Sequence, residues 1–125
     1  MAAVHSQDTS PEIAVRKIVH ALGYRYRLHV PTLPGRPDLV FPCRRKVVFI
    51  HGCFWHRHNG CRYASWPKTN RAFWESKFAA NVARDRRNRR ELKTMDWSVL
   101  TVWQCELKKP ERLTERLDDF LSNAE

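Results

Sequence analysis

The sequence predicts a mixed α/β fold in which helices pack against a central sheet. Short apolar runs at residues 38–41, 46–50 and 97–103 are typical of buried strands. Longer segments at residues 10–22, 71–95 and 110–121 space their apolar residues as helices do. The order α-β-β-β-loop-α-β-α indicates a mixed sheet, and 125 residues suit one domain over residues 1–125.

The first helix is predicted from its capping residues. Ser10 caps, Pro11 fits the first turn, and Glu12 favours the positive end of the helix dipole. Gly23 is expected to end the helix. Its apolar face is expected to consist of Ile13, Ile18, Val19 and Leu22.

Three strands are expected to follow. In residues 24–30, Tyr24, Tyr26, Leu28 and Val30 alternate with polar residues, which predicts a half-buried strand. The turn PTLPGRP leads to a short strand at residues 38–41. The continuous apolar run VVFI in residues 46–50 predicts a central strand that is buried on both faces.

The C-terminal half is predicted to be helix, strand and helix. We expect residues 97–103 to form another buried strand and residues 110–121 to form an amphipathic helix. The apolar positions of the two helices are Phe73, Trp74, Phe78, Val82 and Leu92 in the long one, and Leu113, Leu117, Phe120 and Leu121 in the last.

The composition favours a soluble protein with a polyanionic partner. Hydrophobic residues make up 42% of the chain, and the formal net charge is +10. So large a basic excess in a small domain indicates nucleic acid first and an anionic membrane surface second. No apolar run is long enough to span a bilayer, and the polar N-terminus has no signal-peptide core, so we expect an intracellular protein.

The segment HGCFWHRHNGC, residues 51–61, concentrates metal-binding side chains after a strand. In a reducing compartment, the four cysteines favour a metal over two disulfides. Cys53, His58 and Cys61 offer the thiolate and imidazole ligands that Zn²⁺ prefers. Cys105 would complete a closed, structural Cys3His site if residues 97–103 lie beside residues 46–50. The alternative is buried free cysteines with surface histidines, and Cys43 is expected to stay a free thiol.

The histidines left spare by zinc, His51 and His56, indicate phosphodiester chemistry. His51 ends one strand and Asp38 opens its neighbour, so Asp38 could hold Mg²⁺ while a histidine acts as general base or acid. Glu12 and Asp85 could hold metal-bound water or orient a histidine. The alternatives are a turn residue for Asp38, a helix N-terminal charge for Glu12 and a salt-bridge partner for Asp85.

Large aromatic residues lie in and near this loop. If the loop holds Phe54 and Trp55 outward, they could wedge between base pairs, most easily where the duplex is already weak. Trp66 and Trp74 could join them, although Trp74 could equally be core and Trp66 could pack on its own loop. The arginine run of the long helix is expected to contact phosphates, with a solvated helix face as the alternative. The run contains Arg84, Arg86, Arg87, Arg89 and Arg90.

Five motifs, in this order, match one protein family: LPGRPDLVF, VVFIHGCFWH, FWESK, NVARDRR and WSVLTVWQCEL. Over roughly residues 9–121 the chain resembles the very-short-patch repair (Vsr) DNA mismatch endonucleases. The resemblance implies a restriction-endonuclease-like fold, related to the PD-(D/E)xK nucleases, with an added structural zinc site. It also implies a nick in one DNA strand, 5′ to the thymine of a T·G mismatch left by 5-methylcytosine deamination.

The same resemblance gives roles to single residues. Asp38 matches the main Mg²⁺ ligand. Ile50, at a position where the family usually has threonine, would give its backbone carbonyl to the metal. His51 and His56 match the catalytic histidines. Three further sets complete the match: Glu12 and Asp85 as supporting acids, Cys53, His58, Cys61 and Cys105 as zinc ligands, and Phe54, Trp55 and Trp74 as aromatics that enter the duplex.

One departure from the family concerns the N-terminus. Family members usually carry a longer basic arm, with a pattern like RSxNM, whereas here only MAAVHSQDT precedes the first helix. We therefore expect a Mg²⁺-dependent nickase that is either directed at T·G mismatches or relaxed in specificity. The expected partners are double-stranded DNA and other mismatch-repair proteins. The expected state is a monomer in the bacterial cytoplasm, at the nucleoid.

Three rival functions explain part of the sequence. A zinc-stabilised DNA-binding module would use the charge and the zinc, but it leaves Asp38 and the two spare histidines without a role. A partner-dependent subunit of a repair or restriction complex would be inactive alone. An RNA-directed nuclease would prefer an RNA duplex.

Overall fold

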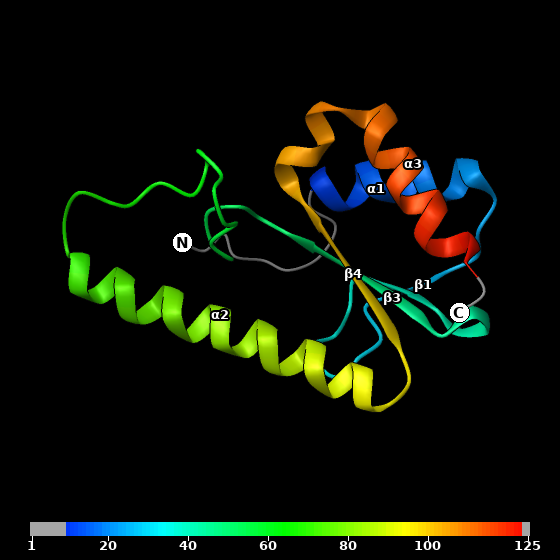
Figure 1. Cartoon of the computed structure of the whole chain (residues 1–125), viewed down its shortest axis with the longest axis horizontal. Coiled ribbons are helices and arrows are strands. Elements are labelled where there is room, and N and C mark those ends of the chain that lie inside the picture. Colours follow the sequence, from blue (N-terminus) through cyan, green and yellow to red (C-terminus); the bar gives the residue numbers. More distant parts are fainter. Residues whose placement is uncertain (1–9, 124–125) are drawn as a thin grey trace.

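The computed structural model of the chain describes residues 10–123. Within that range, helices and strands follow one another in the order that the sequence predicts (Figure 1). The elements are α1 (Ser10–Leu22), β1 (Arg27–Leu28), β2 (Leu39–Phe41), β3 (Lys46–His51), α2 (Arg71–Thr94), β4 (Ser98–Trp103) and α3 (Pro110–Ser122), with short 3-10 helices at Pro42–Arg44 and Gln104–Lys108. None of these helices is long and apolar enough to cross a membrane.

The sheet is mixed, as predicted, and its strands lie in the order β1-β2-β3-β4. β2 runs antiparallel to both β1 and β3, whereas β3 and β4 are parallel. Lys46 lies opposite Ser98 and His51 opposite Trp103, so β3 and β4 pair along their whole length. Their C-terminal ends therefore meet at one edge of the sheet, which is the condition on which the predicted zinc site depends.

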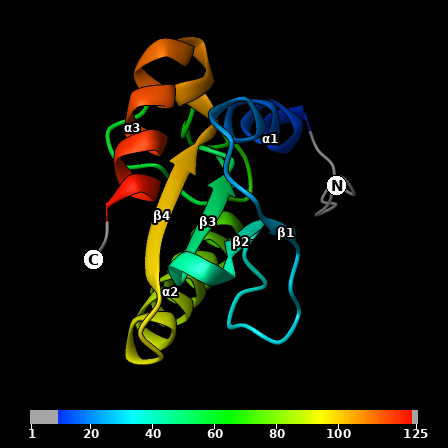
Figure 2. The ribbon, with the colours of Figure 1, turned by 90° about the vertical axis from the view of Figure 1, so that its right-hand side faces the viewer.

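Helices cover both faces of the sheet. Figures 1 and 2 show α1 and α3 together on one face and α2 across the other. In β3, Val48 faces the α1–α3 side while Val47 and Phe49 face α2, which confirms a central strand buried on both faces. The first core consists of Val15, Val19, Leu39, Phe41, Val48, Val102, Leu113, Leu117 and Leu121. The second, smaller core consists of Val40, Val47, Phe49, Leu92 and Trp97.

Two expectations at the N-terminal end are wrong. The strand predicted at residues 24–30 is only Arg27–Leu28, because His29 adopts a left-handed φ of 50° that ends it. Leu28 is 41% exposed, since β1 pairs with β2 alone. Ile13 is also 41% exposed, because the buried face of α1 passes through Val15 and Val19.

Two expectations in the C-terminal half are also wrong. The strand predicted as buried at residues 97–103 is an edge strand, and within β4 only Val102 is fully buried. Phe73 is 59% exposed, because the first half of α2 extends past the sheet and buries only Phe78 there. Leu92, at the far end of α2, packs under the sheet as expected.

A tight turn before β2 positions Asp38. Arg36 N–H donates to the Leu33 carbonyl at 3.0 Å, and Gly35 has a φ of 78°, as a type II turn with proline and glycine at its centre requires. The turn also lies against α2. A Cβ added at Gly35 would come within 2.9 Å of the Asn88 side chain, so a larger residue here is strained by the positive φ and also forces Asn88 to shift.

We predict that Gly35→Ala destabilises the protein more than Gly23→Ala. Both glycines have positive φ, which costs an alanine about 1–2 kcal/mol, but a Cβ at Gly23 would meet no atom within 4 Å. The extra loss at Gly35 is the clash with Asn88. Melting temperatures of the two variants measure the difference, and equal losses would contradict the close approach.

Candidate functional site

Three groups of metal-capable side chains lie in the described part of the chain, and in each the candidate ligand atoms are within 4.8 Å of one another. Some residues of these groups lie at or just beyond the C-terminal ends of β3 and β4, and the others face these strand ends from neighbouring elements. The groups are Cys53, His58, Cys61 and Cys105; His51, His56 and Asp85; and Glu12, His29 and Asp38. Every zinc or catalytic side chain predicted from the sequence falls in one of them, and His29 is the member that the sequence did not reveal.

The cysteine–histidine group joins the ends of two parallel strands. Cys53 is buried and is separated from β3 by Gly52 alone, and Cys105 is separated from β4 by Gln104 alone. Cys105 Sγ lies 3.4 Å from His58 Nδ1. The His58 ring stacks on Trp103 with centroids 4.2 Å apart, which fixes its orientation.

The chemistry of this group fits a zinc ion. All four cysteines of the chain are free thiols, and Cys43 is exposed and outside the group, as expected. Burial raises the pKa of Cys53 to about 12, so its thiol keeps a proton unless a cation takes the proton's place. Three sulfurs and one imidazole are the donors that a structural zinc site uses. The four side chains therefore lie close enough to hold one ion, and the zinc ligand set stays a prediction.

Arg57 holds the loop of this group in shape, and the sequence did not reveal this role. Its guanidinium donates to the backbone carbonyls of Phe54, Ser65 and Ala64 at 3.2, 3.1 and 2.6 Å. It also lies over the Phe78 ring, 4.1 Å from the centroid. These contacts connect both ends of the loop to α2 without a sheet or a helix of the loop's own.

Glu106 and Arg116 fix the other side of the group, around Cys105. Glu106 Oε1 accepts a hydrogen bond from the Trp103 backbone N–H at 2.8 Å. Arg116 Nη1 donates to both carboxylate oxygens of Glu106, at 2.7 and 2.6 Å. Arg116 also donates to the Thr101 carbonyl at 3.1 Å. The short helix that carries Cys105 is thereby fastened to the end of β4 and to α3.

The loop aromatics are not held outward, which corrects the expectation from the sequence. Phe54 and Trp55 are half-buried and pack on α2, with centroid distances of 5.2 Å from Phe54 to Phe78 and 5.7 Å from Trp55 to Trp74. Asn81 Nδ2 donates to the Trp55 carbonyl at 3.2 Å. These rings form an aromatic cluster outside the two cores, because the first half of α2 covers the side of the loop that was expected to face solvent.

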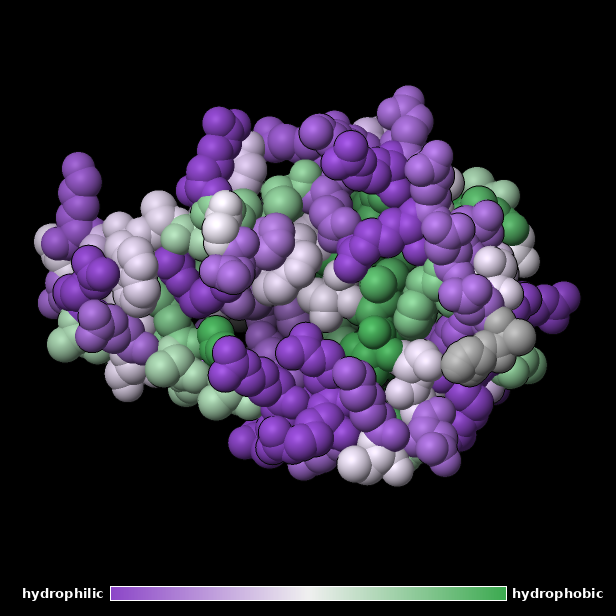
Figure 3. Space-filling view, in the orientation of Figure 1, coloured by the Kyte–Doolittle hydropathy of each residue, from purple (hydrophilic) through white to green (hydrophobic). Residues whose placement is uncertain are grey.

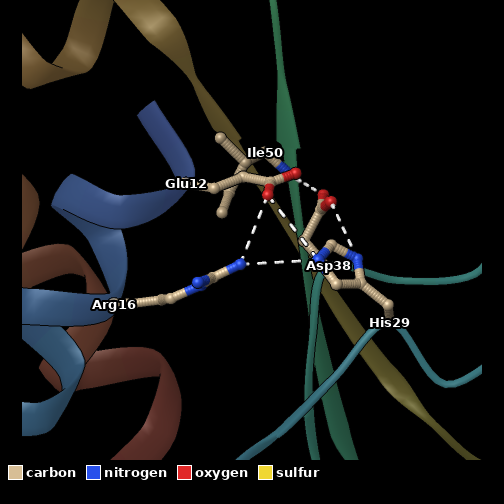
Figure 4. A network of polar contacts seen from close by, with 5 residues as sticks. All are labelled: Glu12, Arg16, His29, Asp38 and Ile50. Atoms are coloured by element: carbon tan, nitrogen blue, oxygen red, sulfur yellow. Dashed lines mark hydrogen bonds and ion pairs between the residues drawn. The ribbon is translucent and has the colours of Figure 1, made fainter. Parts of the chain in front are cut away.

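The acidic group lies where α1, the end of β1 and the start of β2 approach β3 (Figure 4). Asp38 Oδ2 accepts the Ile50 backbone N–H at 2.7 Å. His29 faces both carboxylates, with Nε2 3.6 Å from Glu12 Oε1 and Nδ1 4.0 Å from Asp38 Oδ1. Glu12 is only 5% exposed, so it is neither a simple helix-end charge nor a surface residue.

The electrostatics of this group favour a bound cation. Burial raises the pKa of Asp38 to about 8, and hydrogen bonding and repulsion from Glu12 act in the same direction. The Ile50 N–H and Arg16 oppose this shift but do not overcome it. Two carboxylates that cannot both ionise comfortably are the setting in which a divalent cation replaces a shared proton.

The histidine group forms a chain of contacts from β3 to α2. His51 stacks on His56 with centroids 3.8 Å apart and rings 7° from parallel, and His56 Nδ1 lies 2.7 Å from Asp85 Oδ2. Burial lowers the pKa of His51 to about 3, so this imidazole is neutral at physiological pH. Burial acts to raise the pKa of Asp85, but its hydrogen bond to His56 and nearby positive charges outweigh burial and lower it.

The acidic group and the histidine group adjoin through two consecutive residues. Ile50 meets Asp38 through its backbone, and His51 meets His56 through its side chain. Because Ile50 and His51 are consecutive in β3, the two groups lie beside the same strand end. An acid pair with one buried and one half-buried carboxylate can hold a cation here, and the Asp–His pair beside it can move a proton.

The basic residues of α2 lie on its exposed surface. Arg84, Arg86 and Arg87 are all exposed, and Arg84 also donates to Asn81 at 3.0 Å. Hydrophilic side chains cover much of the face seen in Figure 3. A groove of about 470 Å³ runs between Arg86, Arg89, Arg90, Lys93 and Thr94.

A larger groove, of about 620 Å³, lies between the loop and α2. It is lined by residues such as Arg57, Trp66 and Phe78 and by none of Asp38, His51 and His56. It is therefore not where the acidic and histidine groups meet, and its shape says nothing about the reaction.

Comparisons with known proteins point to one family. The family model described as DNA mismatch endonuclease Vsr matches residues 1–62. The type II nicking enzyme V.XorIIP of Xanthomonas oryzae pv. oryzae is 50% identical over 121 residues, covering 97% of this chain and 88% of that protein. The DNA mismatch endonuclease Vsr of Escherichia coli is 40% identical over 126 residues, covering 97% of this chain and 80% of that protein. The chain belongs to the Vsr DNA mismatch endonuclease family.

As a Vsr-family protein, the chain is a DNA endonuclease, which confirms the predicted class of enzyme. Among solved structures, the catalytic domain of homing endonuclease I-Bth0305I resembles it with a TM-score of 0.64 at 18% identity, covering 90% of this chain and 94% of that one. This likeness supports a nuclease fold and confirms the mixed α/β class. The more specific expectation, that the fold is like that of the restriction endonucleases, stays a prediction.

We predict that the Vsr-family protein without added divalent metal loses thermal stability as pH rises from 6.5 to about 8. The folded chain keeps the Asp38 proton up to a pKa of about 8, whereas an unfolded aspartate loses it near 3.9. Between these two pKa values the unfolded chain has released a proton that the folded chain retains, so each rise in pH favours the unfolded state until the pH exceeds about 8. The lowered pKa of His51 destabilises the fold as pH falls through the ordinary imidazole value near 6.5, so its opposing effect is confined to the lower end of this range.

Melting temperatures across this range, for wild type and Asp38→Asn, measure the effect. Asparagine still accepts the Ile50 N–H but carries no titrating proton, so its melting temperature should change less with pH. Asp119→Asn, at an exposed carboxylate on α3, serves as the control and should follow the wild type. An Asp38→Asn profile as steep as that of wild type would contradict the buried, protonated Asp38.

Proposed function

We propose that this endonuclease is a Mg²⁺-dependent nickase that hydrolyses one strand of duplex DNA, directed at T·G mismatches. The carrying observation is the adjacency of the Glu12–Asp38 carboxylate pair, of which Glu12 is buried and Asp38 half-buried, and a His51–His56–Asp85 chain at the end of β3. The names of the relatives, a DNA mismatch endonuclease and type II nicking enzymes, support nicking and mismatch recognition. The alternative of relaxed specificity depends on residues 1–9, which lie outside the described residues.

Asp38 and the Ile50 backbone would hold the Mg²⁺ ion, with Glu12 facing the same space. In a strand, the N–H and C=O of one residue point to the same side, so the Ile50 carbonyl points to the side on which its N–H meets Asp38. Carboxylate and carbonyl oxygens are the ligands that Mg²⁺ prefers. When bound, Mg²⁺ polarises the phosphate and stabilises the leaving oxygen.

His56 is the residue best placed to move a proton. The ionised Asp85 carboxylate accepts the Nδ1 proton of His56 at 2.7 Å, which leaves Nε2 with its lone pair. That nitrogen can take a proton from the attacking water. His51 stays neutral because of its low pKa, and its ring holds His56 in place by stacking.

DNA would be held by α2 and the loop aromatics. The exposed arginines Arg84, Arg86 and Arg87 would bind phosphates and account for part of the salt dependence of binding. Phe54, Trp55 and Trp74 contact one another in a half-buried cluster. To enter the duplex they would have to leave these contacts, so the wedge would form only on DNA that is easy to unstack.

Nicking of supercoiled plasmid and of matched and T·G-mismatched duplexes tests the proposal. We expect single-strand cuts with Mg²⁺ and none with EDTA, a loss of cutting in Asp38→Ala, and a rate about 10² to 10⁴-fold lower in His56→Ala. Asp119→Ala should cut like wild type. The mismatched duplex should be cut faster than the matched duplex at equal salt.

Three results would contradict the proposal. If folded, zinc-loaded protein cuts none of these substrates, a non-catalytic DNA-binding module or a partner-dependent subunit is favoured. If matched and mismatched duplexes are cut at equal rates, the nickase is relaxed in specificity. A preference for RNA duplex would indicate an RNA-directed nuclease.

We further propose a structural Zn²⁺ ion held by Cys53, His58, Cys61 and Cys105. Cys53→Ser should lower the zinc content of the purified protein from one ion per chain and reduce its melting temperature, because the loop has little core of its own. Cys43→Ser is the matched control, since Cys43 is exposed and outside the group. Elemental analysis that finds equal zinc in the two variants, or none in wild type, would contradict the site.

A further inference from the structure

His29 is placed between two carboxylates by the backbone around it. It follows β1 with a left-handed φ of 50°, and its N–H donates to the Asp38 backbone carbonyl at 3.3 Å. Its side chain is only 15% exposed. The imidazole thus turns inward, toward Glu12 on one side and Asp38 on the other, as Figure 4 shows.

Arg16 determines which imidazole nitrogen carries the lone pair. Its Nη2 lies 3.4 Å from His29 Nε2 and 3.5 Å from Glu12 Oε1. A guanidinium only donates hydrogen bonds, so Nε2 of His29 is the acceptor and the ring proton is on Nδ1, facing Asp38. The Nε2 lone pair and the Glu12 oxygen therefore both point at a positive charge.

The position of that charge is one that a metal ion could take. Nε2 of His29 lies 3.6 Å from Glu12 Oε1, and all candidate ligand atoms of the group are within 4.8 Å of one another. The second ring nitrogen of His29, Nδ1, faces Asp38 Oδ1 at 4.0 Å, which is too far for a hydrogen bond, so the ring is not held to Asp38 through that nitrogen. Arg16, on the flexible stem of an arginine, can withdraw.

We propose that His29 is a nitrogen ligand of the metal ion held by Asp38 and Glu12, and that this ion displaces the Arg16 guanidinium. The inference rests on the proposed function and deepens it, because it assigns the metal preference of the same site. Imidazole favours Mn²⁺ and Co²⁺ over Mg²⁺, which prefers oxygen donors alone. This endonuclease should therefore bind Mn²⁺ more tightly than Mg²⁺.

Mn²⁺ binding to the zinc-loaded protein tests this without reference to activity. Pulsed electron paramagnetic resonance of bound Mn²⁺ detects coupling to a ligand nitrogen, and calorimetry gives the affinities of Mn²⁺ and Mg²⁺. We expect nitrogen coupling in wild type and none in His29→Gln, with Mn²⁺ affinity lowered about tenfold or more and Mg²⁺ affinity lowered less. His20→Gln, at an exposed histidine of α1, is the control and should match wild type.

Arg16→Gln tests the displacement. It removes the competing charge, so Mn²⁺ should bind more tightly than to wild type, and weaker binding would overturn this part. Melting curves establish that each variant is folded.

The outcomes separate this inference from the proposed function. If Mn²⁺ binding depends on Asp38 but shows no nitrogen coupling, the role of His29 is overturned and the Asp38 site is kept. The same conclusion follows if the nitrogen coupling persists in His29→Gln. Mn²⁺ binding that is unchanged in Asp38→Asn overturns both.

Discussion

The site depends on a difference in how far β3 pairs with its two neighbours. β3 pairs with β4 from Lys46 to His51, but with β2 only as far as Val48. The end of β3 therefore projects past β2, and the Ile50 N–H finds the Asp38 carboxylate in place of a strand carbonyl. That one hydrogen bond places a carboxylate beside a free backbone edge, with His51 as the next residue along the strand.

The same strand end separates two kinds of metal chemistry. Parallel pairing brings Cys53 and Cys105 together beyond β3 and β4, where sulfur and imidazole donors suit Zn²⁺. The side toward α1 gathers carboxylates, which suit harder ions. Burial keeps the pKa of Asp38 high and that of His51 low, so these two side chains are both neutral near pH 7 while no cation is bound.

The sequence predicted the site residues that are positioned by strand ends, but not those that are positioned by turns and irregular loops. The predicted zinc ligands lie together, because they follow two recognisable strands. His29 was missed, since its inward direction depends on a left-handed residue that ends β1 earlier than the alternation suggested. Arg57 was missed because its partners are backbone carbonyls of an irregular loop.

The aromatic residues show the limit of local patterns. Phe54 and Trp55 looked unsupported because no strand or helix carries them, yet Trp74 and Phe78 of α2 cover them. These two residues belong to a helix of 24 residues that buries only Phe78 and Leu92 fully. No periodicity within the helix records its packing on the loop, so the packing partner could not be predicted.

The central claim is that Asp38 and its neighbours hold the catalytic cation while the histidine group handles protons. The most direct measurement is the anomalous diffraction of Mn²⁺ in crystals of the zinc-loaded protein. The account predicts an anomalous peak within bonding distance of an Asp38 oxygen, on the side of Glu12. A Mn²⁺ peak between His51, His56 and Asp85, with none at Asp38, would contradict it, because those residues also form a metal-capable group.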